Sequence, residues 1–313
     1  MKVISFVIEL LAILGFNTAQ TSGLGRPPLQ SRQQACNRNA AFCDRPYSNV
    51  SLIGTHDSAF VGSIVDPRVN QEKSVTTQLD AGIRFLQSQT HTINNGAQLE
   101  MCHTTCTELD AGSFQNYLST IKTWLDDSPD DVVTLLIVNG DNVDVSMFDA
   151  VFTSTGLEQY AFVPSTSPNQ LAINDWPTYA EMITANTRLV VFIDSKANQD
   201  KVPYILDEFT YFFETPYDTT DPNFAECTLD RPAGGSADGR MYIVNHFLDA
   251  SLFGILFPND AADDTTNAAT GSGSIGAQAQ LCESEYQRPP NVVLVDMYDR
   301  GNVFAAQDAL NGV

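Results

Sequence analysis

Short, nearly continuous apolar runs recur along the chain and constrain its fold more than any other feature. They are rich in Val, Ile and Leu, and several do not alternate with polar residues, which is typical of parallel strands covered by helices. The seven clearest runs span residues 49–55, 83–89, 97–102, 131–139, 188–194, 241–246 and 291–297.

Amphipathic segments separate many of these runs. In 113–127, apolar residues form a stripe with the 3.6-residue period of a helix. Further helix candidates span 146–155, 178–185 and 204–213. The repeated strand–helix order predicts an α/β fold in a single domain, either a TIM-type (β/α) barrel or an open doubly wound sheet.

Two regions lack a clear period. We expect an eighth strand within the irregular stretch 211–232. The stretch 259–280 is polar, rich in small residues and contains glycine, so it is predicted to be a long flexible loop.

The first residues have the pattern of a secretory signal peptide. Lys2 precedes a mostly apolar run from Val3 to Phe16, which is too short to span a bilayer, and a polar stretch of small residues follows. We expect a signal peptide over approximately residues 1–20 and a secreted, extracellular protein. No other segment reads as a membrane span, so no stable membrane anchor is expected.

Six cysteines fit an oxidising compartment. Their even number suggests three disulfides, although six cysteines allow many pairings. Pairing neighbours along the chain gives Cys36–Cys43, Cys102–Cys106 and Cys227–Cys282. A metal site at CHTTC, residues 102–106, is the weaker alternative.

The chain is strongly acidic, with a net charge of −22 at pH 7. Because it has no basic patch, nucleic acid is not an expected partner. The same charge argues against tight binding to anionic lipid surfaces. Acidity in a secreted protein otherwise indicates only solubility.

Polar residues gather where the predicted strands end. In a barrel the chemistry lies at this carboxyl-terminal face, and all four histidines of the chain fall there. The residues at these ends are His56, Asp57, Gln87, Gln89, His91, His103, Asn139, Asp141, Asp194, Lys196, Asn245, His246, Asp296 and Asp299.

The stretch RFLQSQTH, residues 84–91, carries an unusual polar stripe. Gln87, Gln89 and His91 share one face because strand side chains alternate. A strand covered by helices tolerates such a stripe only where that face opens onto a site. We therefore expect these side chains to face a pocket.

Two histidines on adjacent strands with aspartates nearby favour acid–base chemistry, although a single histidine at a strand end is more often structural. Imidazole titrates near neutral pH, so one ring can take a proton from an attacking hydroxyl and the other can return one to a leaving group. Ser58 lacks a G-x-S-x-G elbow, and the chain has no Gly-rich phosphate loop and no H-E-x-x-H motif.

Several segments together resemble a known family. SLIGTHDSA, QLDAGIRFLQSQTH and LEMCHTTC, followed by LDAGSFQNYLSTIKTWLDDSPDDVVTLLIVN, are similar to the catalytic X-region of phosphatidylinositol-specific phospholipases C. The similarity is closest to the secreted fungal PLC-like phosphodiesterases. WPTYAEMI, RLVVFID, CTLDRP, YIVNHFLD and VLVDMYDRGN fit that group too, so the resemblance covers residues 36–311.

This resemblance implies a TIM-type barrel over residues 36–311 and a phosphoric diester hydrolase. It implies that His56 deprotonates the inositol 2-hydroxyl, which attacks phosphorus, and that His103 protonates the departing diacylglycerol oxygen. Asp57 is then the acid beside the first histidine, and Asp296 is the carboxylate that orients His56. The expected partner is a phospholipid or inositol-phosphate headgroup, including that of a glycosyl-phosphatidylinositol.

Gln87 and Gln89 depart from the family pattern. Bacterial members carry an aspartate and an arginine at these positions, and animal members hold calcium with acids in this strand. Neutral amides supply no charge, whereas stabilising developing phosphoryl charge is a large part of catalysis. The sequence requires no cofactor, and the positive charge is expected from one of two sources. These are a basic side chain, namely His91, Lys196 or Arg300, or a Ca or Mg ion on Asp57, Asp296 or Asp194.

Three functions follow from these residues. The leading one is the two-histidine phosphodiester hydrolase, with a headgroup held by Gln87, Gln89, His91, Asn139, Asp194, Lys196 and Asn245. The second is a catalytically retired barrel that binds a polyol, sugar or lipid headgroup through its amides. The third is a divalent-metal phosphodiesterase acting on lysolipids or sphingolipids, which needs a carboxylate cluster near the histidines.

Overall fold

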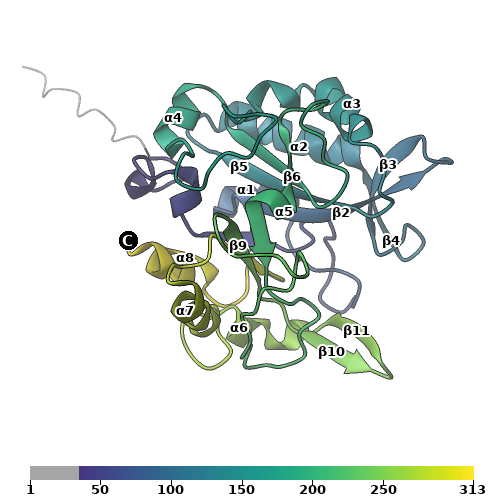
Figure 1. The fold of residues 1–313 in the computed structure, drawn as a ribbon. Helices are drawn as coiled ribbons and strands as arrows, with labels where there is room; N and C mark the ends of the chain where they lie inside the picture. The colour runs from purple at the N-terminus through teal and green to yellow at the C-terminus, as the bar shows by residue number, and fades with distance from the viewer. Residues whose placement is uncertain (1–34) are drawn as a thin grey trace, which may run out of the picture. The chain divides into compact units, whose positions relative to one another are not determined.

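The computed structural model describes residues 35–313, which belong to one structural unit (Figure 1). The expected signal peptide lies outside the described residues. In the part of the chain that is described, no helix is both long and apolar enough to cross a membrane.

Eight parallel strands form one curled sheet in the order β7-β6-β5-β2-β1-β12-β9-β8. This arrangement confirms the predicted TIM-type barrel. The strands are β1 (Leu52–Thr55), β2 (Phe85–Ile93), β5 (Val133–Asn139), β6 (Leu189–Ile193), β7 (Ile205–Asp207), β8 (Phe212–Glu214), β9 (Met241–Asn245) and β12 (Val292–Val295).

The barrel has a seam between β7 and β8. β7 pairs with β6, β8 pairs with β9, and the sheet order ends at these two strands. The four-residue helix α5 (Glu208–Tyr211) connects them. The eighth strand expected within 211–232 is β8.

Five helices pack against the outer face of the sheet: α1 (Val75–Ala81), α2 (Phe114–Asp127), α3 (Ser146–Thr155), α7 (Ile275–Tyr286) and α8 (Val303–Asn311). α4 (Tyr179–Thr184) packs with the interior core instead, and the short α6 (Asp263–Thr266) precedes α7. Short 3-10 turns lie at Ala40–Phe42, Tyr47–Asn49, Leu157–Tyr160 and Asp260–Ala262. The helices predicted over 113–127, 146–155 and 178–185 are confirmed.

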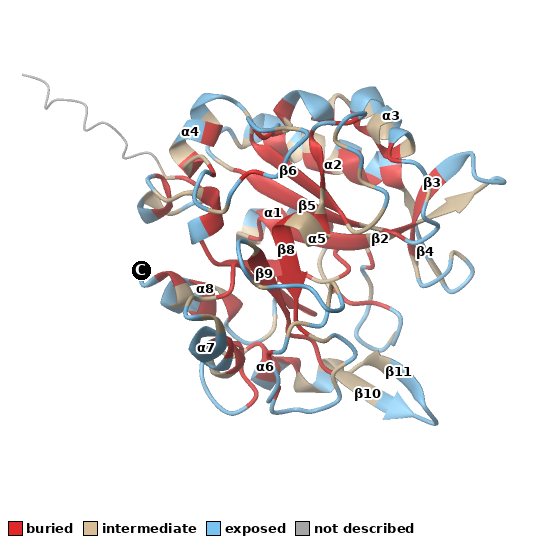
Figure 2. Ribbon diagram, viewed as in Figure 1, coloured by how far each residue is buried: buried red, intermediate tan, exposed pale blue. Residues whose placement is uncertain are grey.

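Strand residues alternate between two cores. Leu135 packs with the covering helices, whereas its neighbour Leu136 faces the barrel interior with Phe85 and Phe192. Burial of both faces explains why the strands read as continuous apolar runs (Figure 2). Gly54 in β1 keeps this interior tight, because a Cβ there would lie 2.8 Å from the Leu294 side chain.

Three predictions of secondary structure are corrected. Residues 97–102 form β3 (Gln98–His103), but it pairs antiparallel with β2 and with β4 (Leu109–Ser113) and lies outside the parallel order. Residues 204–213 are the unit β7–α5–β8 rather than one helix, because Asp207 accepts a hydrogen bond from the Thr210 N–H and starts a new turn.

The third correction concerns 259–280. This stretch contains α6 and the start of α7 instead of a continuous flexible loop. The Ser274 hydroxyl caps α7 by accepting from the Ala277 N–H, and Cys282 anchors the helix in the core. The sequence pattern did not predict this helix, because its small residues form no apolar stripe.

The three neighbouring-cysteine disulfides are all present. Cys102 and Cys106 are bonded to each other, so the metal alternative for CHTTC is wrong.

A separate hairpin projects from the unit. It consists of β10 (Asp249–Leu252) and β11 (Ile255–Pro258), which pair antiparallel and join no other strand (Figure 1).

Candidate active site

His56 and Asp296 follow two neighbouring strands of the barrel. His56 comes directly after β1 and Asp296 directly after β12, and these strands pair in parallel register. The His56 Nδ1 atom lies 2.8 Å from Asp296 Oδ1, and Asn70 Nδ2 donates to both Asp296 oxygens at 3.2 Å. Because a carboxylate accepts hydrogen bonds, it fixes the proton on Nδ1 and leaves Nε2 as the acid–base atom.

Asp57 lies between two imidazoles. Its Oδ2 atom is 3.5 Å from His56 Nε2 and 3.4 Å from His103 Nε2, although the two histidines are far apart in sequence. The carboxylate is fully buried. Its backbone adopts φ +47°, a left-handed conformation that aspartate tolerates better than most residues.

The two glutamines of the polar stripe hold Asp57 in place. Gln89 Nε2 donates to Asp57 Oδ2 at 3.0 Å, and the Asp57 N–H donates to Gln87 Oε1 at 2.7 Å. The polar stripe therefore faces the site, as the alternation of strand side chains predicts. Both glutamine amides contact Asp57, which in turn contacts both histidines.

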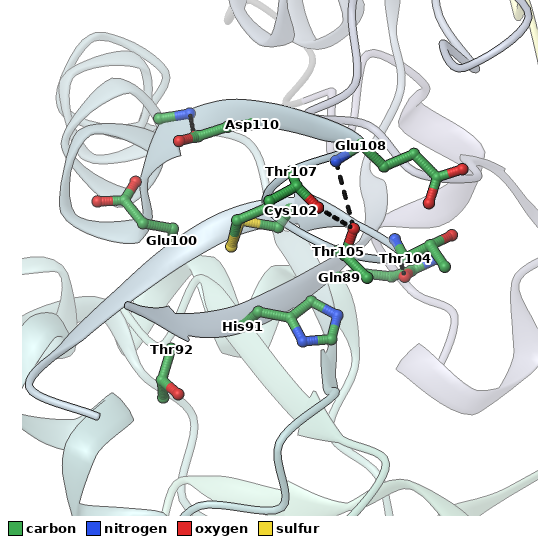
Figure 3. The surroundings of a disulfide bond; sticks show 12 residues. Gln89, His91, Thr92, Glu100, Cys102, Thr104, Thr105, Thr107, Glu108 and Asp110 are labelled. Atoms are coloured by element: carbon green, nitrogen blue, oxygen red, sulfur yellow. Dashed lines mark hydrogen bonds between the residues drawn. A yellow bond between two sulfur atoms is a disulfide. The ribbon is translucent and has the colours of Figure 1, made fainter. Parts of the chain in front are cut away.

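His103 ends β3 and contacts the connection between β1 and α1. Its Nδ1 lies 2.9 Å from the Arg68 carbonyl oxygen, so Nδ1–H donates there and Nε2 points to Asp57. The Cys102–Cys106 disulfide closes the turn that follows, and the Thr104 N–H donates to Gln89 Oε1 at 3.2 Å (Figure 3).

Aromatic rings pack against both imidazoles. His56 stacks on Phe247 with ring centroids 3.7 Å apart, and His103 lies 4.9 Å from the Phe60 ring. These apolar contacts restrict ring rotation and limit access of water to one side of each imidazole.

Nearby carboxylates change the protonation of His56. Burial lowers the pKa of its imidazole, but Asp57 and Asp296 outweigh burial and raise it to about 9. Burial also raises the pKa of Asp57, against the opposing effect of the two histidines. The site therefore holds at least one proton near neutral pH.

A cavity opens beside His56 inside the barrel. Side chains from several strand ends and from the connection after β8 surround it. They are His56, Gln87, Gln89, Leu136, Val138, Asp194, Glu208, Glu214, Tyr217, Arg231, Asn245, Phe247 and Leu294.

Arg231 places a positive charge in this cavity. It forms an ion pair with the buried Glu214, and its guanidinium lies 4.5 Å from the centroid of the Tyr217 ring. Burial and the neighbouring Glu214 raise the pKa of Glu208 well above its ordinary value. Glu208 and the Glu214–Arg231 ion pair make this wall rich in hydrogen-bonding groups.

Two sets of the predicted site residues lie at this site. The four candidate catalytic residues His56, Asp57, His103 and Asp296 come together, and Gln87, Gln89, Asp194 and Asn245 line the cavity.

His91, Asn139 and Lys196 are not among the side chains that line this cavity. His91 pairs with Asp141 at 2.9 Å, and the Asn139 amide bonds to backbone atoms of Val143 and Ser195. Lys196 is exposed in a turn with φ +64°.

Sequence reasoning missed Arg231 and proposed Arg300 instead. Arg300 pairs with Glu72 at 3.1 Å and is not among the cavity residues. Arg231 lies in an aperiodic stretch, where it pairs with Glu214 through an isolated antiparallel bridge. CTLDRP carried a signal of family resemblance, but nothing in its pattern placed the arginine. His246, the fourth histidine, is buried and bonds to Gln278.

The acids considered for a divalent ion do not fit one. Across residues 35–313 no group of three or more His, Cys, Asp or Glu is arranged to hold a metal. Asp296 bonds to His56 and Asn70, and Asp194 Oδ1 accepts the Asn139 N–H at 2.9 Å. We derive no step through a metal ion.

Solved structures define the class to which this fold belongs. The phosphatidylinositol-specific phospholipase C of Listeria monocytogenes matches with a TM-score of 0.56 at 15% identity, over 87% of this chain and 95% of that one. A mutant of the Staphylococcus aureus enzyme gives a TM-score of 0.58 at 12% identity, over 86% of this chain and 94% of that one. The fold is that of the phosphatidylinositol-specific phospholipases C.

Sequence comparison then gives the family. Residues 42–311 match the family model described as PI-PLC X 1. A PI-PLC X domain-containing protein 1 of Arthroderma benhamiae is 53% identical over 279 residues, 89% of this chain and 90% of the relative. An uncharacterized secreted protein of the same fungus is 44% identical over 294 residues, 91% of this chain and 65% of its own length. The chain belongs to the PI-PLC X domain family, which confirms the resemblance seen in its motifs.

Proposed function

We propose that this protein is a phosphodiesterase that cleaves the headgroup phosphodiester of a phosphatidylinositol or glycosyl-phosphatidylinositol. The observation that carries the proposal is the position of His56 and His103, whose Nε2 atoms both lie within 3.5 Å of Asp57 Oδ2. One phosphate can then reach both imidazoles, which a two-histidine mechanism requires.

In this mechanism His56 Nε2 takes the proton of the attacking inositol hydroxyl as its oxygen bonds to phosphorus. Asp296 stabilises the imidazolium that forms. The bond from phosphorus to the lipid oxygen breaks, and His103 donates its Nε2 proton to that oxygen. Asp57 contacts both rings, so its charge favours the protonated form of each in turn.

The cavity beside His56 suits a polyol. The Arg231–Glu214 pair and the amides of Gln87, Gln89 and Asn245 offer both donors and acceptors for ring hydroxyls. Because Glu214 balances much of the Arg231 charge, we assign this wall to the headgroup ring. The phosphate then lies at the histidines, where the protonated His103 and, after proton transfer, the His56 imidazolium balance its charge.

The resemblance to bacterial phosphatidylinositol-specific phospholipases C implies that they carry an arginine at the position of Gln89. An amide donates a hydrogen bond without charge, so the proposed enzyme has one fewer cation at the reacting phosphate. Removing one such donor from an active site costs roughly 3 kcal/mol. We therefore expect slow turnover rather than the rate of an enzyme with the arginine.

We also propose that the protein is secreted. The apolar N-terminal run, the three disulfides and the printed name of the secreted relative support this location. Disulfides persist in oxidising compartments. Detecting the protein in culture medium with its N-terminus cleaved near residue 20 tests the proposal.

The activity test uses histidine variants matched to one another. Release of a phosphatidylinositol headgroup is measured for the wild type, His56→Ala, His103→Ala and His91→Ala. We expect His56→Ala and His103→Ala to lose at least a hundredfold in rate, while His91→Ala retains activity because His91 pairs with Asp141.

The same assay is run with EDTA and with added calcium. Activity that survives EDTA supports the metal-free mechanism, whereas activity only with calcium would contradict it. Equal loss in all three histidine variants would also contradict it, because general instability would then explain the effect.

A second candidate function, headgroup binding without hydrolysis, is favoured by the neutral amides and the compensated charge of Arg231. Calorimetric titration with inositol and with inositol phosphates distinguishes it. Binding by a folded protein that hydrolyses none of the phosphodiesters would favour this candidate.

A further inference from the structure

A second cavity contains two arginines that have no acidic partner. It has a volume of about 330 Å³, and Arg45 and Arg288 both line it. None of the described side chains in its wall is acidic. Four other arginines of the chain, Arg68, Arg84, Arg231 and Arg300, each pair with an aspartate or glutamate. Within residues 35–313, no such ion pair involves Arg45 or Arg288.

The missing partner is notable because carboxylates are abundant in this chain, which has 38 acidic and only 16 basic residues. Burial lowers the pKa of Arg288. Burial acts on Arg231 in the same direction, but its acidic neighbours, Glu214 first, raise the pKa of Arg231 overall. An anion from solution would give Arg288 the compensation that Glu214 gives Arg231.

Buried asparagines hold both guanidinium groups in place. Arg45 Nη2 donates to the Asn311 carbonyl oxygen at 2.9 Å, and Arg288 Nη1 donates to Asn291 Oδ1 at 2.9 Å. Each asparagine is 7% exposed, and its amide donates in turn to a carbonyl oxygen of the segment before β1, at 2.8 and 2.6 Å. The Arg288 guanidinium also lies 4.8 Å from the centroid of the Tyr242 ring. The two cations are therefore fixed before any ligand arrives.

Both guanidinium groups keep N–H donors that the fold does not use. A guanidinium carries five such donors. Arg45 uses two of them on Asn311, while Arg288 uses one on Asn291 and one on the Arg240 carbonyl oxygen. The planar arrangement of the remaining donors matches the oxygens of a phosphate group.

The cavity lies at the opposite end of the barrel from the proposed active site. Its wall includes Ser51, directly before β1, and Asn291, directly before β12. His56 and Asp296 directly follow the same two strands. The strand from Ser51 to His56 spans roughly 16 Å, so one small ligand cannot contact both places. The arginine cavity is thus separate from the histidine pair.

The rest of the wall suits hydroxyl groups. Asn49 and Asn174 are exposed amides at the cavity, which offer both donors and acceptors. Among the described residues that line it, none is aromatic, so a nucleotide base would find no ring on which to stack. The volume falls at the lower end of the range for small-molecule pockets, about 300 to 1,000 Å³. A phosphate carried by a small polyol fits these properties better than a nucleotide does.

The acidity of the whole chain does not prevent such binding. A net charge of −22 repels anions at long range. At an ionic strength of about 0.15 M, however, exposed charges farther away than about 8 Å are largely screened. The charges nearest the ligand, Arg45 and Arg288, then dominate its binding.

We propose that this cavity binds the phosphate group of a small polyol phosphate, such as a hexose phosphate, through Arg45 and Arg288. Free inorganic phosphate has the same chemistry and is the other possible source of the group. The site is independent of the proposed hydrolysis at the histidines, so either proposal can fail without the other.

The test is isothermal titration calorimetry with glucose 6-phosphate and with inorganic phosphate at an ionic strength of about 0.15 M. In Arg45→Gln and in Arg288→Gln the Kd should rise at least tenfold, the effect of losing one charge-assisted hydrogen bond. Arg300→Gln removes the same charge from a pair with Glu72 and should leave the Kd unchanged. His56→Ala should also leave it unchanged, because His56 lies at the other end of β1.

The two ligands distinguish the source of the phosphate. Tighter binding of glucose 6-phosphate supports a polyol phosphate, and tighter binding of inorganic phosphate supports the free ion at the same site. Arg45 is half-exposed, so Arg45→Gln decides the test even if Arg288→Gln does not fold.

The proposal is overturned if the wild type binds neither ligand at millimolar concentration, or if Arg45→Gln binds as well as the wild type. It is also overturned if Arg300→Gln weakens binding as much as Arg45→Gln, because overall charge would then explain the effect. Binding that is lost in His56→Ala but kept in Arg45→Gln would overturn it too, since the anion would belong to the active site.

Discussion

The imidazole of His56 lies between two carboxylates, and this position predicts the pH dependence of activity. A base must be neutral, and a pKa of about 9 means that His56 is still protonated at neutral pH. The pH dependence of kcat/KM reports the pKa values of groups in the free enzyme. We therefore expect kcat/KM to rise with pH, with the midpoint of the rise near pH 9. Titration of the His56 ring by NMR and a kcat/KM profile measure this pKa.

Asp57→Asn checks the cause of that shift. Removing the Asp57 charge lowers the pKa of His56. The rising limb of the kcat/KM–pH profile should therefore move toward lower pH, while the maximal rate falls. Asp141→Asn, beside His91, is the matched control and should leave the limb in place. A limb near the ordinary histidine pKa of 6.5 in the wild type would contradict the prediction.

Arg231 is expected to act both in binding and in stability. In Arg231→Met the KM for a headgroup substrate should rise about tenfold, the loss of one charge-assisted hydrogen bond. The free energy of unfolding of the variant should also fall by about 2 kcal/mol, because Glu214 is left buried without its ion-pair partner.

A second substitution separates these two effects. Arg231→Met with Glu214→Gln removes the buried charge, so stability should recover while the KM stays high. Arg300→Met breaks a half-exposed pair with Glu72 and should change neither quantity much. An unchanged KM in Arg231→Met would remove Arg231 from the headgroup wall.

At the scale of elements, the Cys102–Cys106 disulfide adjoins His103, the proposed general acid. The turn it closes carries His103 at the end of β3. A double Cys→Ser variant at these positions should lose about 2 kcal/mol or less of unfolding free energy, because the closed loop is short. Its kcat should fall at least tenfold. Rates and thermal unfolding measure the two effects.

The Cys36–Cys43 disulfide is the control at this scale. It also closes a short loop and packs in the interior core beneath the barrel strands, with Phe42 and Tyr47. Its double serine variant should lose a similar amount of stability and retain kcat. Equal losses of kcat in both variants would show that the first disulfide acts only through stability.

Sequence patterns locate the long elements and fail on the short ones. Continuous apolar runs identify β1, β5, β6, β9 and β12 because both faces of these strands are buried. The same logic cannot resolve Ile205–Glu214, where two three-residue strands flank one helical turn. No period develops over so few residues, so their apolar content was read as a helix.

At the scale of the whole molecule, charge repulsion should make stability depend on salt. A net charge of −22 is spread over one chain, and like charges repel more in the folded state than in the expanded one. Raising ionic strength from about 0.01 M to about 0.15 M shortens the screening length from about 30 Å to about 8 Å. The melting temperature should rise by a few degrees, and a fall would contradict this account.

The barrel and its histidine pair follow from the sequence, whereas the composition of the cavity beside His56 does not. Strand alternation places Gln87 and Gln89 on the inner face, and strand ends bring His56 and Asp296 together. Arg231 reaches the same cavity from an aperiodic connection held by Cys227 and an isolated bridge to Glu214. The position of Arg231 depends on tertiary contacts, so it cannot be predicted from the local sequence pattern.

The seam between β7 and β8 gives the cavity wall a freedom that a closed cylinder lacks. Glu208 and Glu214 lie at this seam, and the residues around them carry no ladder hydrogen bonds from one strand to the other. Insertions or substitutions in α5 can therefore change the bore of the cavity while the rest of the sheet keeps its register. For an evolving lineage, or for an engineer, the seam is a place where the shape of the cavity can change at low cost to folding.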